Sequence, residues 1–498
     1  MMMIRSINNG IFQKTIFKST LNRFHSTKVA IIGSGPSGFY TAYHLLKKSK
    51  GDLKVDVFEK LPVPYGLVRF GVAPDHPEVK NCTDTFEEIS NSPDFSFFGN
   101  VKIGKDVSLK ELRDNYNCIV FSYGCDEDNL IGLSKIPGID SKGVITARKF
   151  VGWYNGLPDF QDLNPPLDQV ENVIIIGNGN VALDVARTML VPIEAWSKTD
   201  ITANAQNVLK KSKVKNVKIV ARRGFLQTAF TNKEFRELLE LYNYGVGFSP
   251  VPTEFLDPVR PFIKNFGRVH KRRLELIDRY FEAIKQNVNF PKTFELDYLK
   301  SPIEVKPSSK NPAILESTKF QVNNLLEDDE KNSTKVVPTD ITITYKNELL
   351  ITSTGYRGSA LPGFEEFGIL FDEKRGRILN EHGRIKNSKN PDSFVDGFYS
   401  SGWISKGPTG VIASTMIDSF DTGDLILEDK LQGKFESEPK EGAQGIAKIL
   451  QNRNHLYVTW KDWKKLEAKE IQDGKKVGKL REKITDVDKM LDVLRNLK

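Results

Sequence analysis

Near its N-terminus the chain reads Lys28-Val-Ala-Ile-Ile32 and continues with Gly33-Ser-Gly-Pro-Ser-Gly38. The first run is short, apolar and β-branched, which is typical of a buried parallel strand. The second run has the spacing GxGxxG and leads into Phe39–Lys48, whose pattern predicts a helix. A strand, a glycine-rich turn and a helix in this order predict the phosphate-binding turn of a Rossmann unit.

Each glycine of this turn has its own task. Gly33 allows the tight turn, Gly35 lets backbone N–H groups approach a diphosphate, and Gly38 lets the helix pack closely on the strand. The positive end of the helix dipole adds attraction for the phosphates. A second strand, Lys54-Val-Asp-Val-Phe58, ends in Glu59, whose carboxylate can accept hydrogen bonds from a ribose hydroxyl pair. We therefore expect a dinucleotide with a free ribose at this first unit.

The same pattern recurs further along the chain. Asn172-Val-Ile-Ile-Ile176 predicts a strand, and Gly177-Asn-Gly-Asn-Val-Ala182 is the GxGxxA variant of the turn. Leu183–Leu190 continues as a predicted helix, and Asn216–Val220 predicts the next strand. The sequence therefore predicts a second dinucleotide-binding unit.

The two units differ at the end of their second strand. Where the first has Glu59, the second has Arg222 and Arg223. A carboxylate would repel a 2′-phosphate, whereas paired guanidinium groups bind it through charge-assisted hydrogen bonds. We therefore expect the second unit to hold NADP(H). The alternative is that the two arginines are a solvated strand end.

A third element follows the second unit. Leu349–Thr354 and Gly397-Phe-Tyr-Ser-Ser401 predict strands, and Thr409–Asp421 predicts a helix whose start contains Gly410-Val411-Ile412. This element resembles the motif by which flavoproteins with two dinucleotides close over the flavin. Its backbone N–H groups and helix dipole can stabilise negative charge on a reduced flavin, and Trp403 can stack near it or belong to the core.

These elements predict an α/β protein with two Rossmann-like dinucleotide-binding domains. We expect an FAD-binding domain that is split in sequence, over residues 28–127 and 358–498, with an NADP-binding domain inserted at 128–357. The boundaries should fall near Glu127–Gly132 and Gly358–Gly363. The charged stretch Asn323–Pro338 is predicted to be a surface excursion.

Composition excludes several other classes of protein. The chain has 498 residues, of which 39% are hydrophobic and 27% charged, and no stretch approaches about 18 uncharged apolar residues. These values exclude a disordered, collagen-like or membrane-spanning chain. Its six histidines are scattered, so we expect no protein-borne metal site. Cys82, Cys118 and Cys125 form no CxxC or CxxxxC pair, which disfavours disulfide-reductase chemistry.

Residues 1–27 are predicted to be a mitochondrial transit peptide. They contain Arg5, Lys14, Lys18 and Arg23 among hydroxyl and spaced apolar residues, and they contain no Asp or Glu. Removing them takes four charges from the net charge of +8, which leaves about +4. We therefore expect a mitochondrial matrix protein that does not bind nucleic acid.

The sequence resembles the mitochondrial adrenodoxin reductases, which are NADPH:ferredoxin oxidoreductases. The resemblance extends from about Lys28 to the C-terminus, and its most specific run is Tyr65-Gly-Leu-Val-Arg-Phe-Gly-Val-Ala-Pro-Asp-His-Pro-Glu-Val-Lys80. Further runs that carry it are Gly33–Ala42, Gly152–Leu157, Gly177–Arg187 and Gly402–Ile412.

This resemblance implies two cofactors, FAD and NADP(H), and a set of residues for each. Beside the glycines of the first turn, the FAD contacts would fall on Ser37, Glu59, Leu67, Ile103, Trp403, Gly410, Val411 and Ile412. The NADP contacts would fall on Asn178, Gly179, Asn180, Val181, Arg222, Arg223, Glu234 and Gly410. His76 and Glu234 would lie near the reacting rings as catalytic residues, although His76 also fits a capping or packing role beside Pro74 and Pro77.

The resemblance also implies a partner, an acidic [2Fe–2S] ferredoxin that docks transiently. The docking residues would be Arg236, Arg268, Lys271, Arg272 and Arg273, which form a basic face, and a solvated helix face is the alternative. The expected oligomeric state is a monomer, and peripheral association with the inner membrane stays open.

Two further functions use the same folds. One is a flavin monooxygenase or NADPH oxidase, and the other is a binding protein that senses nucleotides and keeps its flavin as a structural group.

The activity that the resemblance implies is hydride transfer from NADPH to FAD, followed by single-electron transfer to the ferredoxin, which feeds cytochrome P450, iron–sulfur or haem pathways.

Overall fold

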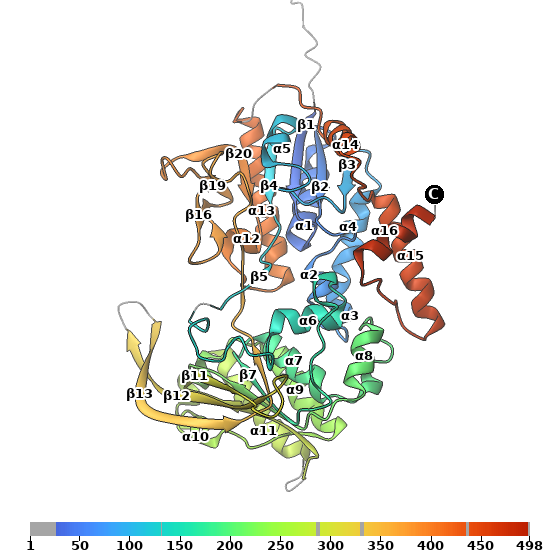
Figure 1. Ribbon diagram of the computed structural model, residues 1–498. Helices are drawn as coiled ribbons and strands as arrows, with labels where there is room; N and C mark the ends of the chain where they lie inside the picture. The colour runs from blue at the N-terminus through green and yellow to red at the C-terminus, as the bar shows by residue number, and fades with distance from the viewer. Residues whose placement is uncertain (1–25, 131, 285–288, 329–332, 435–437, 497–498) are drawn as a thin grey trace, which may run out of the picture.

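The computed structural model describes residues 26–130, 132–284, 289–328, 333–434 and 438–496 (Figure 1). The predicted transit peptide lies almost entirely outside these residues, and the first strand begins at Thr27. Within them, no helix is both long and apolar enough to cross a membrane, and no cluster of three His, Cys, Asp or Glu side chains could hold a metal ion. The chain forms two separate sheets with helices packed around them, so the predicted α/β class with two Rossmann-like units is confirmed.

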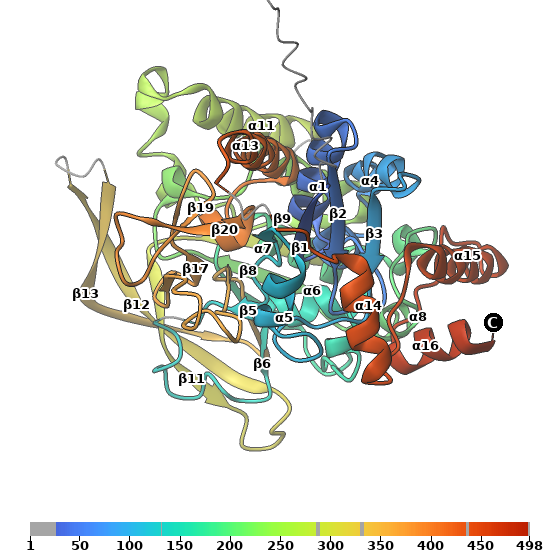
Figure 2. The same cartoon turned by 90° about the horizontal axis from the view of Figure 1, so that it is seen from above.

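The first sheet has seven strands in the order β18-β19-β20-β4-β1-β2-β3. Their bounds are β1 Thr27–Ile32, β2 Leu53–Phe58, β3 Phe95–Phe98, β4 Cys118–Phe121, β18 Asn380–Glu381, β19 Arg384–Lys386 and β20 Phe394–Ser400. The strands from β20 to β3 run parallel. Helices α1 (Pro36–Ser49) and α13 (Ile412–Leu431) lie side by side against it (Figure 2), so segments nearly 400 residues apart build one layer.

The second sheet has six strands in the order β6-β14-β7-β8-β10-β9, and every neighbouring pair is parallel. The bounds are β6 Val144–Thr146, β7 Asn172–Ile176, β8 Asn216–Val220, β9 Val246–Phe248, β10 Lys292–Asp297 and β14 Leu349–Thr352. Helices that cover it include α6 (Ala147–Asn155), α7 (Asn180–Leu190), α8 (Ala203–Leu209), α9 (Asn232–Leu239) and α11 (Arg268–Ile284). Strands β7 and β8 have the bounds that their apolar runs predict, and both lie inside the sheet with a strand on either side.

The chain passes between the two sheets twice, along one narrow ribbon. Strand β5 (Glu127–Asp128) carries it out and β15 (Tyr356–Arg357) carries it back, and the two pair antiparallel. The ribbon lies between the upper and lower halves of the molecule in Figure 1. We therefore propose that the domains divide at this ribbon, as expected for residues 28–127, 128–357 and 358–498.

An antiparallel sheet of β11 (Lys300–Pro307), β12 (Leu315–Asp328) and β13 (Ser333–Lys346) packs beside the second sheet. The charged stretch Asn323–Pro338, predicted as a surface excursion, lies largely in the long hairpin of β12 and β13, with 329–332 outside the described residues. A sheet that packs on one face exposes charged side chains on the other, which accounts for the charge pattern of this stretch.

The C-terminal region adds α14 (Ala443–Asn452), α15 (Trp460–Lys476) and α16 (Val487–Asn496). We call the connection between α15 and α16, residues 477–486, the C-terminal strap. Within it, the Nζ of buried Lys483 donates to the carbonyl of Arg69 at 3.1 Å, on the FAD side, and to that of Asn155 at 3.0 Å, on α6. The strap therefore contacts both halves of the molecule.

Buried ion pairs reinforce the same junction. Asp200 binds the Nζ of Lys80 at 2.8 Å and the Nζ of Lys483 at 3.1 Å. Beside this junction and within the FAD side, Arg69 and Glu470 of α15 form a two-pronged pair in which the side chains are 3% and 0% exposed. Charges buried this deeply hold their position only while each is paired.

Replacing Glu470 with alanine should lower the free energy of unfolding by about 3–5 kcal/mol, because it leaves the Arg69 guanidinium buried without its carboxylate. Thermal melting followed by circular dichroism measures the loss. As a control, Asp114→Ala breaks the exposed pair with Lys110 and should leave the melting temperature unchanged. Equal effects of the two variants would contradict this account of the buried pair.

Candidate dinucleotide sites

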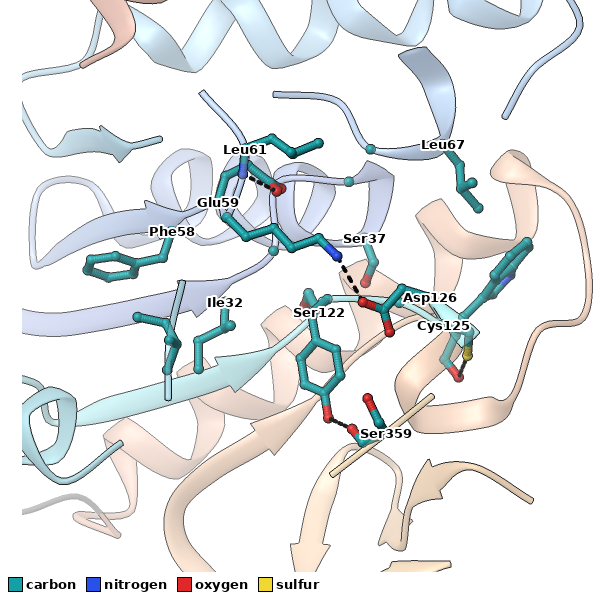
Figure 3. Close-up of a pocket in the computed structure, with 18 of the residues that line it drawn as sticks. Ile32, Ser37, Phe58, Glu59, Leu61, Leu67, Ser122, Cys125, Asp126 and Ser359 are labelled. Atoms are coloured by element: carbon teal, nitrogen blue, oxygen red, sulfur yellow. Dashed lines mark hydrogen bonds and ion pairs between the residues drawn. The ribbon is translucent and has the colours of Figure 1, made fainter. Parts of the chain in front are cut away.

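A cavity of about 530 Å³ opens at the carboxyl ends of β1, β2 and β4 (Figure 3). It contains nine of the residues that the sequence predicts for FAD: Gly33, Gly35, Ser37, Glu59, Leu67, Ile103, Trp403, Val411 and Ile412. They come from both segments of the split sheet, so folding brings together residues up to 379 positions apart. Crevices at the carboxyl ends of parallel strands are the usual place for ligands in this fold class.

The glycines of the first turn divide into packing and open positions. Gly33 has φ +104°, and a Cβ on it would lie 2.6 Å from the carbonyl oxygen of Ser122. A Cβ on Gly38 would lie 2.0 Å from the carbonyl oxygen of Gly33, behind the cavity rather than in its lining. A Cβ on Gly35 would meet nothing within 4 Å. Space is therefore left at the N-terminus of α1, where a diphosphate can approach the backbone.

Glu59 is held in place at the end of β2. Its Oε2 accepts hydrogen bonds from the hydroxyl of Ser34 at 2.6 Å and the N–H of Ser34 at 3.2 Å, and its Oε1 accepts one from the N–H of Leu61 at 3.1 Å. A carboxylate has about four acceptor positions, so it retains capacity for a ribose hydroxyl.

The closing motif faces this turn. Trp403 begins α12 (Trp403–Lys406) and stacks on Tyr356 of the ribbon, with ring centroids 5.8 Å apart. Val411 caps the N-terminus of α13 and lines the cavity, whereas exposed Gly410 adjoins it. The helix α13 is longer than the predicted Thr409–Asp421 and begins three residues later.

The second turn has the same division of glycines. Gly177 has φ +113°, and a Cβ on it would lie 2.1 Å from the carbonyl oxygen of Ser353, whereas a Cβ on Gly179 would meet nothing within 4 Å. The side-chain nitrogen of Asn178 is buried without a hydrogen-bond partner among the described residues. Asn180 begins α7, accepts a hydrogen bond from the N–H of Thr231 at 2.8 Å, and is followed by Val181.

Two further groups near this turn lack protein partners. The Oε2 of Glu234, on α9, is buried without a hydrogen bond among the described residues. Arg222 and Arg223 follow β8, and in the described part of the chain neither guanidinium pairs with a carboxylate. The two cations are therefore free to bind an anion such as a 2′-phosphate.

A network of charges joins the two halves beside these turns. The Nε2 of His76 lies 2.8 Å from a carboxylate oxygen of Glu237 and 3.0 Å from the Nη1 of Arg187. Arg187 also donates to Glu237 at 2.7 Å, to Asp75 at 3.2 Å and to Asp184 at 2.9 Å. His76 and Asp75 belong to the FAD side, and the other three residues lie on α7 and α9.

This network shifts the pKa values of its members. Burial by itself would lower the pKa of His76, but the hydrogen bond with Glu237 and the charge of Asp75 outweigh it, so the pKa is raised. Burial raises the pKa of Asp184 to about 6 despite the nearby guanidinium of Arg187. The protonated form of His76 is therefore more favoured than that of an exposed histidine.

The partners of His76 were not among the residues predicted from the sequence. Glu234 is the second predicted catalytic residue, but Glu237, one helical turn later on α9, is the carboxylate that contacts His76. The contact joins residues 161 positions apart in the sequence. The only hint in the sequence is that Glu234 and Glu237 are three residues apart, so they lie on the same face of helix α9. His76 itself does not line the cavity, and its catalytic role and that of Glu234 stay predictions.

Comparison with known proteins places the chain in one family. Residues 31–98 match the model of the NAD(P)-binding Rossmann-like domain. The chain is 42% identical over 476 residues to the human protein named NADPH:adrenodoxin oxidoreductase, mitochondrial, covering 94% of this chain and 92% of that one. It is 41% identical over 518 residues to the protein of Saccharomyces cerevisiae with the same name, marked probable, covering 98% of both.

The chain belongs to the adrenodoxin reductase family. A solved structure agrees, since FprA of Mycobacterium tuberculosis, in complex with NADPH, superposes with a TM-score of 0.83 at 35% identity, covering 94% of this chain and 99% of that one. The predicted resemblance is confirmed.

The docking residues predicted for this member of the adrenodoxin reductase family differ in how exposed their side chains are. Arg236 on α9 and Arg268 at the start of α11 are exposed, and Lys271 and Arg272 are partly exposed. Arg273 is different, because its side chain is buried and donates to the hydroxyl of Thr228 and to the carbonyl of Phe230 at 2.9 Å. The prediction that Arg273 lies on the docking face is therefore wrong for this structure, since α11 turns it toward the core.

The cysteines fit an adrenodoxin reductase better than a disulfide reductase. Cys125 lines the cavity, but its Sγ is hydrogen-bonded to the carbonyl of Trp403 at 3.5 Å, and all three cysteines are free. Burial raises the pKa of Cys125 to about 12 and that of Cys82 to about 11. Neither thiol is therefore a thiolate at neutral pH.

The two kinds of glycine give a test of the first site. Gly35→Ala should fold but purify with little or no FAD, because its methyl group projects into the space at the start of α1. Gly38→Ala should fail to accumulate as folded protein, because its methyl group would overlap the Gly33 carbonyl. Flavin absorbance and circular dichroism measure both. A Gly35→Ala protein with full FAD content would contradict this placement of the diphosphate.

Proposed function

We propose that this chain is an NADPH-dependent FAD oxidoreductase that reduces a mitochondrial [2Fe–2S] ferredoxin of the adrenodoxin type. The observation that carries the proposal is the occurrence of two dinucleotide turns in one chain, one followed by a carboxylate and the other by two arginines that have no carboxylate partner among the described residues. Similarity over almost the whole length to proteins named NADPH:adrenodoxin oxidoreductase supports it.

The residues present fit both cofactors. At the first turn, the open position at Gly35 and the carboxylate of Glu59 suit the diphosphate and ribose of FAD. At the second, the open position at Gly179 and the unpartnered polar atoms of Asn178 and Glu234 suit NADPH. When bound, FAD supplies the redox chemistry, taking a hydride from NADPH and releasing electrons one at a time.

The protein's contribution is to position and to shield. The N-termini of α1 and α13 direct backbone N–H groups into the cavity, where they stabilise negative charge. Arg222 and Arg223 bind the 2′-phosphate and so select NADPH over NADH. The proton at the Nε2 of His76 is held against Glu237, at the junction between the two nucleotide sites.

The same comparisons support a mitochondrial location for the protein. The relatives are named as mitochondrial proteins, which agrees with the transit peptide predicted over residues 1–27. We therefore place the mature enzyme in the mitochondrial matrix, working as a monomer on the ferredoxin. Exposed Arg236 and Arg268, with Lys271 and Arg272, form its docking face.

The central test is anaerobic stopped-flow reduction. Mixing with NADPH should bleach the flavin absorbance, and adding an adrenodoxin-type ferredoxin should restore it while the ferredoxin is reduced. Failure of NADPH to bleach the flavin would instead favour a nucleotide-sensing protein. Rapid oxygen consumption without ferredoxin would favour a monooxygenase or oxidase.

The docking face has its own test. Arg236→Ala combined with Arg268→Ala should lower kcat/KM for ferredoxin by about tenfold at low salt, and the difference from wild type should shrink as salt is added. Ferredoxin-dependent reduction of cytochrome c measures the rate. Lys448→Ala, on α14 at the opposite end of the molecule (Figure 1), is the matched control and should behave as wild type. A salt-independent loss would contradict electrostatic docking at this face.

A further inference from the structure

The turn that carries Arg222 and Arg223 is held through its backbone by the neighbouring antiparallel sheet. Three consecutive carbonyl groups accept hydrogen bonds from this sheet and from Leu299, the residue that precedes it. The N–H of Lys300 donates to Ala221 at 3.0 Å, the N–H of Leu299 donates to Arg223 at 3.2 Å, and the side chain of Asn323 donates to Arg222 at 3.1 Å. The middle bond is the only one of these three that depends on a side chain.

The Asn323 side chain is buried and held by two hydrogen bonds. The residue is 2% exposed, and its Nδ2 gives its second hydrogen bond to the hydroxyl of Ser301 at 2.9 Å. Its backbone N–H donates to the carbonyl of Leu299 at 2.7 Å. Both hydrogens of the amide are therefore committed, and the group has little freedom to turn away from Arg222.

An irregularity in the hairpin accompanies this placement. The pairing of β12 with β13 shifts between Gln321 and Asn323, so that residues 339–341 of β13 stand opposite Val322 alone. The hydroxyl of Thr339 donates to the carbonyl of Val322 at 2.9 Å and holds this bulge in place. Bulges bend a strand and redirect its side chains, so this one gives a local reason why Asn323 is turned inward.

The carbonyl that Asn323 binds belongs to the peptide group joining the two arginines. Because a peptide group is planar and includes the Cα atoms on either side, fixing its orientation fixes the positions of both Cα atoms from which the two arginine side chains extend. We propose that Asn323 is a positioning residue for cofactor selection, which acts through the Arg222 carbonyl to aim both guanidinium groups at the 2′-phosphate of NADPH. The inference rests on the proposed function, since it needs NADPH at this turn.

The test compares two adenosine nucleotides that differ at the 2′ position. In Asn323→Ala holoenzyme, the Kd for 2′,5′-ADP should rise about tenfold, while that for 5′-AMP stays the same. The KM for NADPH should rise by a similar factor with kcat unchanged. Isothermal titration calorimetry and steady-state rates with ferricyanide measure these values. Equal weakening of both nucleotides, or no weakening of either, would overturn the proposal.

A matched control separates positioning from general stability. Asn347→Ala removes another fully buried asparagine of the same domain, whose Nδ2 donates to the carbonyl of Leu349 at 3.1 Å. It should leave the preference for 2′,5′-ADP intact, and a loss as large as that of Asn323→Ala would overturn the proposal. Should Asn323→Ala not fold, Ser301→Ala removes only the acceptor that orients the amide, and we expect about a threefold loss of preference. An unchanged preference in that variant would likewise count against the idea.

A reference variant keeps the two levels of inference apart. Arg222→Ala combined with Arg223→Ala should abolish the preference for 2′,5′-ADP over 5′-AMP, as expected for two charge-assisted contacts. If it does not, the assignment of NADPH to this turn fails. If it does while Asn323→Ala keeps the preference, only the role of Asn323 fails.

Discussion

Asp200 holds together the two halves on whose relative placement the chemistry depends. Its carboxylate lies between Lys80, from the FAD side, and Lys483, from the C-terminal strap. Burial lowers the pKa of Lys483 to about 7, and Asp200 opposes that shift. Hydride transfer requires two rings in contact, so an error of an ångström between the halves would cost rate. A narrow ribbon of two short strands is the covalent link, which leaves the buried ion pairs and the strap to limit the angle between them.

The two nucleotide turns solve the same backbone problem and then diverge in charge. Both place one glycine against a carbonyl of the neighbouring strand and leave another open at the helix N-terminus. Glu59 is fixed through its own side chain, by bonds from Ser34 and Leu61. Arg222 and Arg223 are fixed through their backbone carbonyls instead, which leaves their guanidinium groups without carboxylate partners among the described residues. A site for a diffusible anion needs that second arrangement, because a paired cation would have to break its pair before binding.

How far the sequence could predict this molecule depended on the range of each interaction. Strands β7 and β8, the two glycine-rich turns and the residue types at their tips are local patterns, and the predictions for them agree with the structure. Glu237, Lys483 and Asn323 act across 101 to 414 positions in sequence, and nothing local marks them. Arg273 shows the opposite error, because a run of basic residues was taken as one face although a helix turns successive residues in different directions. The sequence of this basic run gives the number of charges, but the turn of helix α11 determines which of the side chains reach the surface.

His76 lies outside the cavity, and its contacts join the two halves of the molecule. Its Nε2 is within bonding distance of both a carboxylate oxygen and a guanidinium nitrogen, yet it cannot donate to one and accept from the other at the same time. When protonated it donates to Glu237, and when neutral it can accept from Arg187. Because the pKa of His76 is raised, the contribution of the protonated contact is complete below the unfolded value near 6.5 and is lost only as pH rises through the higher folded value. Below that folded value the bond to Glu237 joins the FAD side to helix α9, which also carries Glu234.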